Sequence, residues 1–244
     1  MVDDIFIKKI RDVFRLSEKY HAPRFSKFLD GAQQAELVRE GMAGGTLFGG
    51  YEDAERKLLG VFPEWQEPED AAFPIAVLFA KKKYSRELSH RDYLGTVLSL
   101  GIERDKIGDI LVTDEGAYIF VLEDIAEFIC ANVTKISGCG AKVVVCQPGS
   151  VVIPEKKFCK IQAVAGSLRL DAVIAAMLKI SRNDAKAMIL SGKVSVNHTE
   201  ILNGDFLLKQ EDLLSVRGFG RAVLSEIGGK TRSDRVHITL KKYL

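Results

Sequence analysis

The chain has 244 residues, of which 47% are hydrophobic, so its length allows one or more domains and its composition allows a buried core. No run of about 18 apolar residues occurs, and the opening sequence MVDDIFIKKIRDVF is a charged amphipathic pattern rather than a signal sequence. These features exclude a protein that spans a membrane and predict a soluble, cytoplasmic one.

The net charge of +2 is distributed unevenly along the chain. Residues 164–244 contain 13 Lys and Arg against 8 Asp and Glu, which gives +5, whereas the first 163 residues contain 22 against 25, which gives −3. A localised basic excess is expected of a domain that binds a polyanion, although many solvated surfaces carry as much. We therefore look for a nucleic-acid-binding pattern in the last third of the chain.

The cysteines have neither CxxC spacing nor a histidine at metal spacing; they are Cys130, Cys139, Cys146 and Cys159. We interpret them as scattered buried thiols and expect no disulfide framework, no metal and no cofactor.

Residues 1–70 are predicted to form a small, mostly helical domain. An amphipathic helix begins near Ile5 and ends before His21-Ala22-Pro23, and a second helix follows the Asp30-Gly31 start. In GGTLFGGYEDAERKLLGVFP, a strand-like TLF lies between two Gly-Gly pairs, and a third helix is predicted over 52–59. The doubled glycines lack the spacing of phosphate-binding loops, so tight turns are favoured over a phosphate cradle. Glu55 and Arg56 are interpreted as structural rather than catalytic.

Residues 71–162 begin in the linker-like sequence WQEPEDAAFP (65–74) and then alternate strand and helix patterns. The predicted order is strand 74–82, helix 89–102, strands 108–113 and 117–122, helix 123–136 and strand 141–147. This is the split βαβ order of ferredoxin-like domains and RNA-recognition motifs (RRMs). A middle domain of this type is therefore expected.

The sequence EGAYIFV (115–121) resembles the third-strand signature of RRM domains, whose aromatic side chains stack on bases. Tyr118 and Phe120 share one face, while Ala117, Ile119 and Val121 share the other, so either set could form the core. Many proteins with this topology bind no nucleic acid. A candidate second RNA surface, with a solvated basic edge as its alternative, comprises Lys81, Lys82, Lys83, Arg86, Arg91, Tyr118 and Phe120.

Residues 164–244 carry the most specific pattern. An apolar stripe predicts one helix, and its members are Leu170, Val173, Ile174 and Met177. Ser181 is expected to cap a second helix and Gly192 to end it. Arg182 and Lys186 are four residues apart and therefore project together.

The sequence SLRLDAVIAAMLKISRNDAKAMILSGKVSVN, followed by EDLLSVRGFGR, resembles the S4-type RNA-binding domain, or αL motif, of a small-subunit ribosomal protein, tyrosyl-tRNA synthetases and pseudouridine synthases. The resemblance implies that helices and turns present basic residues to structured RNA, which agrees with how such groups contact phosphates. The RNA contacts it implies are Arg169, Ser181, Arg182, Lys186, Lys193, Asn197, Arg217 and Arg221. Local ion-pair and turn roles remain the alternative for Asp171 and Asn197. We expect Arg182, Lys186 and Lys193 to form one phosphate-facing edge.

Across nearly its whole length the chain resembles the YlmH-type proteins of Gram-positive bacteria, through FSKFLD, FGGYEDAER, HRDYLGTVLSLGIERDKIGDI and the S4 module. The patterns of the three segments predict an α+β protein with three domains: a small, mostly helical N-terminal domain, a split βαβ middle domain and a C-terminal S4 domain. The resemblance implies binding to large-subunit ribosomal RNA and tRNA in ribosome-associated quality control of stalled nascent chains. A monomer is expected. A third interpretation, besides the RNA-binding protein and the enzyme, makes the N-terminal domain a docking surface for a division or translation protein.

The alternative is an RNA-modifying enzyme resembling pseudouridine synthases, with the S4 module as its RNA anchor. Those enzymes follow the catalytic Asp with Thr or Ser and Gly, whereas Asp171 is followed by Ala-Val-Ile-Ala within a predicted helix. The histidines His21, His90, His198 and His237 lie in different segments and form no triad. We therefore predict a non-enzymatic RNA-binding protein with no catalytic residues.

Overall fold

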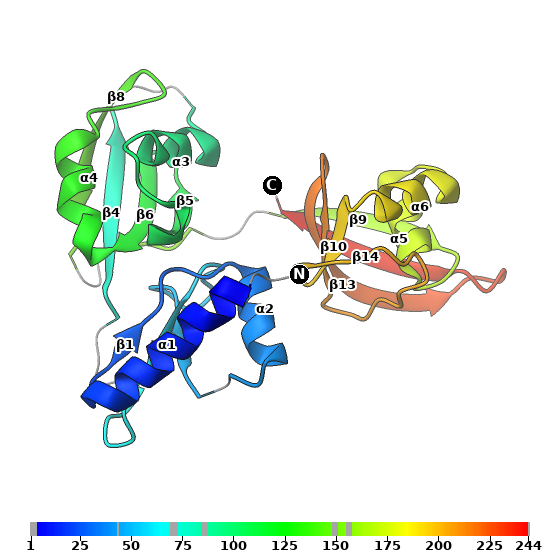
Figure 1. Cartoon of the computed structure of the whole chain (residues 1–244). Helices are drawn as coiled ribbons and strands as arrows, with labels where there is room; N and C mark the ends of the chain where they lie inside the picture. Colours follow the sequence, from blue (N-terminus) through cyan, green and yellow to red (C-terminus); the bar gives the residue numbers. More distant parts are fainter. Residues whose placement is uncertain are drawn as a thin grey trace. The chain divides into compact units, whose positions relative to one another are not determined.

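A computed structural model describes residues 4–42, 44–68, 73–83, 87–147, 151–154 and 158–243 (Figure 1). The chain forms two compact units, Met1–Pro154 and Glu155–Leu244, and both contain helices and strands, so the predicted α+β class is confirmed. None of the helices in these described ranges is both long and apolar enough to cross a membrane.

The N-terminal part of the first unit packs two helices on a small sheet. Helix α1 (Asp4–Tyr20) buries Ile10 against the sheet core, and α2 (Gly31–Arg39) begins at Asp30, whose carboxylate accepts a hydrogen bond from the Gln33 amide (2.9 Å). The sheet has the order β1-β3-β2, formed by Arg24–Phe25, Leu58–Val61 and Thr46–Phe48. The two predicted helices and the TLF strand are therefore present.

The third predicted helix, over 52–59, is wrong. This segment forms turns that lead into β3, because the backbone amides of Glu55 and Arg56 donate to the side chain of Asp109 (2.7 and 3.1 Å). Amides held by a distant carboxylate are not available for the ladder of a helix. Leu58 and Leu59 then pair with Phe48 and Leu47 in the sheet and are buried.

The middle part of the first unit has the predicted split βαβ topology. Its elements in chain order are β4 (Ile75–Lys82), α3 (His90–Leu98), β5 (Ile107–Val112), β6 (Gly116–Leu122), α4 (Ala126–Asn132), β7 (Lys135–Ile136) and β8 (Cys139–Val145). The antiparallel sheet has the order β5-β6-β4-β8-β7. The second predicted helix ends earlier than expected, because residues 135–136 pair with β8 instead of continuing it.

Helices α3 and α4 pack on one face of this sheet. The buried cluster between them contains Ala117, Ile119 and Val121 of β6 together with Tyr93 of α3 and Ile129 of α4. The period of 2 therefore places the small and β-branched set of β6 toward the helices. The aromatic set of β6 lies on the opposite face.

Part of that opposite face is covered by the N-terminal residues. Phe120 has no exposed surface and packs with Phe28 and Leu58, which are equally buried. Asp109 fixes the contact, because its carboxylate accepts a hydrogen bond from the Tyr51 hydroxyl (2.8 Å) in addition to the two loop amides. Burial and the neighbouring carboxylate of Asp109 raise the pKa of Tyr51 above its ordinary range.

Two arginines complete this contact between the N-terminal and middle residues. Arg56 donates to the carbonyl groups of Ile107 and Phe28 (both 3.0 Å), so its structural interpretation is confirmed. Burial lowers the pKa of Arg104, whose guanidinium also donates to the Ile107 carbonyl, to about 10. Gly50 has φ +97°, and a Cβ there would lie 2.6 Å from the Phe120 ring, which explains this part of the doubled glycines as a tight turn.

The second unit is a six-stranded antiparallel sheet with two helices, α5 (Leu170–Leu178) and α6 (Arg182–Leu190) (Figure 1). The strand order is β11-β10-β12-β13-β14-β9, formed by Thr199–Glu200, Val194–Val196, Leu213–Val216, Gly220–Lys230, Val236–Tyr243 and Phe158–Ala165. Pairing of β9 with β14 joins the residues before α5 to the end of the chain. The division of the chain into three domains, at 1–70, 71–162 and 164–244, stays a prediction.

Candidate nucleic-acid interface

Helices α5 and α6 form from local signals and pack on the sheet through apolar stripes. Leu170, Val173 and Ile174 of α5 are fully buried, as are Ala185 and Ile189 of α6. The predicted stripe of α5 and the apolar residues of α6 therefore form the core, and the polar residues on the same helices are left at its rim.

The junction into α6 has the predicted cap. Ser181 Oγ accepts a hydrogen bond from the Asp184 amide (3.1 Å) and also lies 2.7 Å from the Asp184 carboxylate. Gly192 follows the helix with φ +67°. Ser181 thus serves first as a cap, and its predicted RNA contact would be additional.

The first turn of α5 holds a buried carboxylate, Asp171, which has no exposed surface. Its backbone amide donates to the Gly204 carbonyl (3.0 Å), and the neighbouring Leu170 amide donates to the Phe206 carbonyl (2.8 Å). The loop around residue 205 therefore satisfies the free amides at this end of the helix and fixes the position of the carboxylate.

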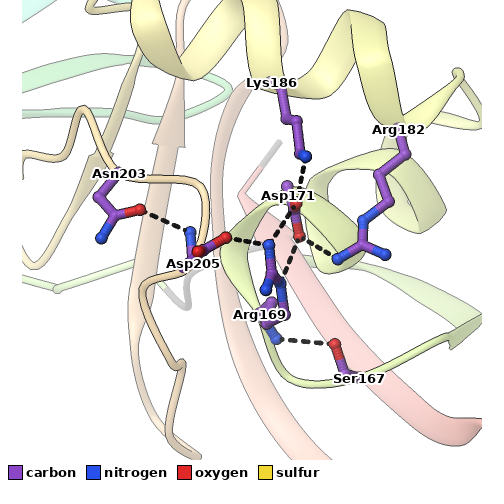
Figure 2. Close-up of polar contacts among 7 residues, drawn as sticks. All are labelled: Ser167, Arg169, Asp171, Arg182, Lys186, Asn203 and Asp205. Carbon is purple, nitrogen blue, oxygen red and sulfur yellow. Dashed lines mark hydrogen bonds and ion pairs between the residues drawn. The ribbon is translucent and has the colours of Figure 1, made fainter.

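Three cations converge on Asp171 (Figure 2). Arg169 contacts both carboxylate oxygens (3.3 and 3.1 Å), Arg182 donates to Oδ1 (3.0 Å), and Lys186 Nζ lies 3.8 Å from Oδ2. The carboxylate is buried, whereas the Arg169, Arg182 and Lys186 side chains are 32%, 51% and 48% exposed. The cations are thus anchored at one side and open to solvent on the other.

The charges in this cluster stabilise one another. Burial alone would raise the pKa of Asp171, but hydrogen bonds from Arg169 and Arg182 hold it below its ordinary value of 3.8. The hydrogen bond to Asp171 likewise raises the pKa of Arg169. Arg169 also pairs with Asp205, an exposed loop carboxylate, so three cations face two carboxylates and the cluster keeps a positive charge.

A second basic group surrounds an open hollow of about 430 Å³ at the other end of α6. Lys193 and Arg217 are adjacent there, because the Arg217 amide donates to the Lys193 carbonyl (2.9 Å). Arg221 also lines the hollow, and its guanidinium lies 5.2 Å from the centre of the Tyr243 ring. Polar side chains at the wall belong to Ser195, His198, Glu200 and Ser215.

The structure thus places the predicted S4 contacts in two groups. Arg169, Arg182 and Lys186 meet at Asp171, whereas Lys193 follows the opposite end of α6, a helix of nine residues and therefore about 13 Å long. The expectation that Arg182, Lys186 and Lys193 form one phosphate-facing edge stays a prediction. Asn197 lies in the β10–β11 turn. Its side-chain Nδ2 donates to the Asp212 carboxylate (2.8 Å), and its side-chain Oδ1 accepts from the backbone amide of Leu213 (2.9 Å).

The candidate second surface, on the middle part of the first unit, is not one patch. Phe120 is buried under Phe28 and Leu58, so no base can stack on it, which corrects that prediction. Tyr118 remains partly exposed on the same face, whereas Arg91 lies on α3, which packs on the opposite face. The exposed lysines Lys81 and Lys83 and the half-buried Lys82 lie at the end of β4, and Arg86 is outside the described residues.

Sequence reasoning missed the anchoring of the cluster. Asp171 was expected to pair at most with Arg169, and Asp205 was not considered. Asp171 and Arg182 are 11 residues apart across two predicted helices and their turn, and this spacing could have predicted their ion pair. Asp205 is 36 residues from Arg169 in a loop, and no sequence pattern predicts that pair.

No metal or disulfide site is present among the described residues. No group of three or more His, Cys, Asp or Glu in those ranges could hold a metal ion. The four cysteines are free, and burial raises the pKa of Cys130 and Cys146, but Cys159 is exposed, which corrects the expectation of uniform burial. Asp171 is inaccessible and held by three cations, so it cannot act as the nucleophile of a pseudouridine synthase.

Two family models match parts of the chain, and a relative and a solved structure match more of it. Residues 68–147 match the family model described as "Putative RNA-binding domain in YlmH", and residues 168–214 match that of the S4 domain. Ribosome-associated protein quality control protein P2 of Bacillus subtilis (strain 168) is 30% identical over 243 residues, which are 97% of this chain and 94% of that protein. The solved structure of cell division protein ylmH from Streptococcus pneumoniae matches with a TM-score of 0.49 and 25% identity, over 59% of this chain and 91% of that chain.

Proposed function

The chain belongs to the YlmH family of proteins with an S4 RNA-binding domain, and we propose that it binds large-subunit ribosomal RNA and tRNA in ribosome-associated quality control of stalled nascent chains. The descriptions of its family and relative name RNA binding and quality control rather than an enzymatic activity. The S4 unit is the main contact in this proposal. A monomeric state and a protein partner for the N-terminal residues stay predictions.

The observation that carries the proposal is the set of three cations held by Asp171. Long side chains lose conformational freedom when they bind a ligand, and that loss opposes binding. In the cluster, Arg169, Arg182 and Lys186 are already oriented by one buried carboxylate while their outer sides stay exposed. Such a surface suits phosphates at fixed positions on folded RNA, where contacts position the protein without reading the bases.

Asp205 provides a position on Arg169 that an RNA phosphate can take. This exposed carboxylate occupies one side of the Arg169 guanidinium, and its side chain is 62% exposed. An RNA phosphate offers the guanidinium equivalent acceptor oxygens and can replace Asp205 without leaving a buried charge behind. Asp171 cannot be displaced in the same way, so it remains the anchor while Asp205 exchanges.

The test is the salt dependence of binding by the full chain. With Arg182 and Lys186 both changed to Ala, we expect weaker binding to purified large subunits carrying tRNA, and a slope of log K against log[salt] that is shallower by about 1–2, since about 0.7–0.9 of a counterion is released per phosphate contact. A matched control changes Lys230 and Arg232 to Ala, which removes the same charge from exposed positions of the same unit. Unchanged affinity and slope in a folded R182A/K186A protein would overturn the proposal.

A further inference from the structure

Three exposed apolar side chains lie beside the S4 cluster, in the loop that precedes β12. Leu202, Phe206 and Leu207 are 53%, 37% and 66% exposed, and all three belong to the short stretch 202–207. The Phe206 amide donates to the Asn203 carbonyl (3.3 Å), and the two ends of such a turn are within about 7 Å of each other. Leu202 on one side of the turn and Phe206 and Leu207 on the other therefore form one surface, which we call the apolar tip.

The apolar tip is fixed to the same helix end as the cations. The carbonyl groups of Gly204 and Phe206 accept hydrogen bonds from the first two amides of α5 (3.0 and 2.8 Å), and Leu208, directly after the tip, is buried in the core. Asp205, within the turn, pairs with Arg169 of the cluster (Figure 2). The tip and the cations therefore belong to one continuous surface, in which the apolar side chains are held out into solvent.

The chemistry of the apolar tip does not suit RNA. Residues 201–207 contain one carboxylate, Asp205, and no Lys or Arg, so phosphates gain no attraction from them. Bases bind proteins by stacking on aromatic rings or guanidinium groups, whereas the most exposed members of the tip, Leu202 and Leu207, are aliphatic. Exposed apolar groups of this kind instead fit an apolar pocket on a protein.

We propose that the apolar tip docks into an apolar pocket of a basic protein that is bound to the same RNA as the S4 cluster. The inference rests on the proposed function, because phosphates held by Arg169, Arg182 and Lys186 bring the tip against the surface beside that RNA. Proteins bound to RNA are themselves rich in Lys and Arg. Asp205 supplies the complementary charge, since its carboxylate is free to pair with a cation of the partner once a phosphate has replaced it on Arg169.

The experiment compares the affinity of the full chain for intact large subunits carrying tRNA with its affinity for protein-free large-subunit RNA at low salt. Changing Leu202 and Leu207 to Ser removes the apolar groups at exposed positions. We expect affinity for the subunits to fall about 5- to 30-fold per leucine, which corresponds to about 1–2 kcal/mol for the surface that a pocket buries. Affinity for protein-free RNA and the salt slope should stay unchanged, since an apolar contact releases no counterions.

Two exposed apolar residues outside the tip give a matched control. Leu190 and Val38 are 71% and 76% exposed, and changing both to Ser should leave both affinities unchanged. Asp205→Asn tests the charge of the partner. It should lower affinity for the subunits relative to protein-free RNA, because the partner loses a carboxylate while the phosphates lose a competitor for Arg169. An unchanged ratio of the two affinities would overturn the assignment of a basic partner.

Three results decide against the inference. A folded L202S/L207S protein that keeps its affinity for the subunits overturns it, and an equal fall toward protein-free RNA assigns the tip to RNA. A dimer of the free chain that the same change dissociates assigns the tip to a second copy. The R182A/K186A protein is judged separately, because it should lose affinity for both the subunits and the protein-free RNA. Loss with L202S/L207S but not with R182A/K186A would remove the proposed function alone, and the reverse would remove only this inference.

Discussion

Replacing Asp171 with Asn tests whether the buried carboxylate organises the S4 surface. The change keeps the shape of the side chain and removes the charge that Arg169, Arg182 and Lys186 share. A hydrogen bond to a charged group contributes about 1.5–3 kcal/mol, and breaking a fully buried ion pair costs about 3–5 kcal/mol. Water can reach the outer side of all three cations, so we expect a loss of about 2–3 kcal/mol in the free energy of unfolding.

Calorimetry of the full chain measures this loss. The second unit spans residues 155–244, and for a unit of this size about 1 kcal/mol corresponds to roughly 4–8 °C, so its transition should fall by roughly 10–20 °C while that of the first unit stays in place. Asp205→Asn is the matched control, because Asp205 also pairs with Arg169 but is exposed. Its effect should be below about 1 kcal/mol.

The pH dependence gives the sharper outcome. The folded pKa of Asp171 lies below its ordinary value of 3.8, so the stabilisation it contributes is fully present above about pH 4 and is lost as the pH falls through the folded pKa. The difference between the wild-type and D171N proteins should therefore shrink at acid pH. An equal Tm at pH 7, or a difference that does not change between pH 7 and pH 3, would refute the reasoning.

Three other substitutions test the contacts that hold the fold around these surfaces. Ser181→Ala should lower the free energy of unfolding, measured by urea denaturation, by about 1 kcal/mol through loss of the α6 cap. An unchanged free energy of unfolding would show that the cap does not contribute. Tyr51→Phe removes the hydroxyl that donates to the Asp109 carboxylate and should cost about 1.5–3 kcal/mol in the first unit, measured by calorimetry; an unchanged transition contradicts the role of this contact. Gly50→Ala places a Cβ against the Phe120 ring at φ +97° and should destabilise the first unit, visible as faster amide exchange around Phe120; unaltered exchange argues against close packing there.

Sequence patterns predicted the elements whose signals are local. The stripe of α5, the cap and glycine stop of α6 and the order of strands and helices along the middle of the chain all follow from residues within one element or its ends. For the same reason Arg182 and Lys186 could be placed together before the structure was known.

The predictions that were wrong depend on residues far apart in the chain. Residues 52–59 have a helical composition, but Asp109, more than 50 positions later, holds their amides in a loop. A period of 2 placed Phe120 and Ile119 on opposite faces of the strand, but it could show neither which face the helices cover nor that Phe28 covers Phe120. Strand β14 had an unused signal in the alternation of Val236, Ile238 and Leu240, whereas β9 alternates only weakly and is recognised mainly by its pairing with β14.

The contact between the N-terminal residues and the middle sheet has a practical consequence for how the protein can be divided. A fragment that begins at residue 71 would lose Phe28, Leu58 and the Tyr51 hydroxyl, and would expose the Phe120 ring together with the unpaired carboxylate of Asp109. An apolar patch of this kind promotes association between copies and nonspecific adhesion to other surfaces. Fragments cut at residue 154 keep the patch covered, so RNA binding by the isolated middle region is best measured with residues 1–154 rather than with the split βαβ domain alone.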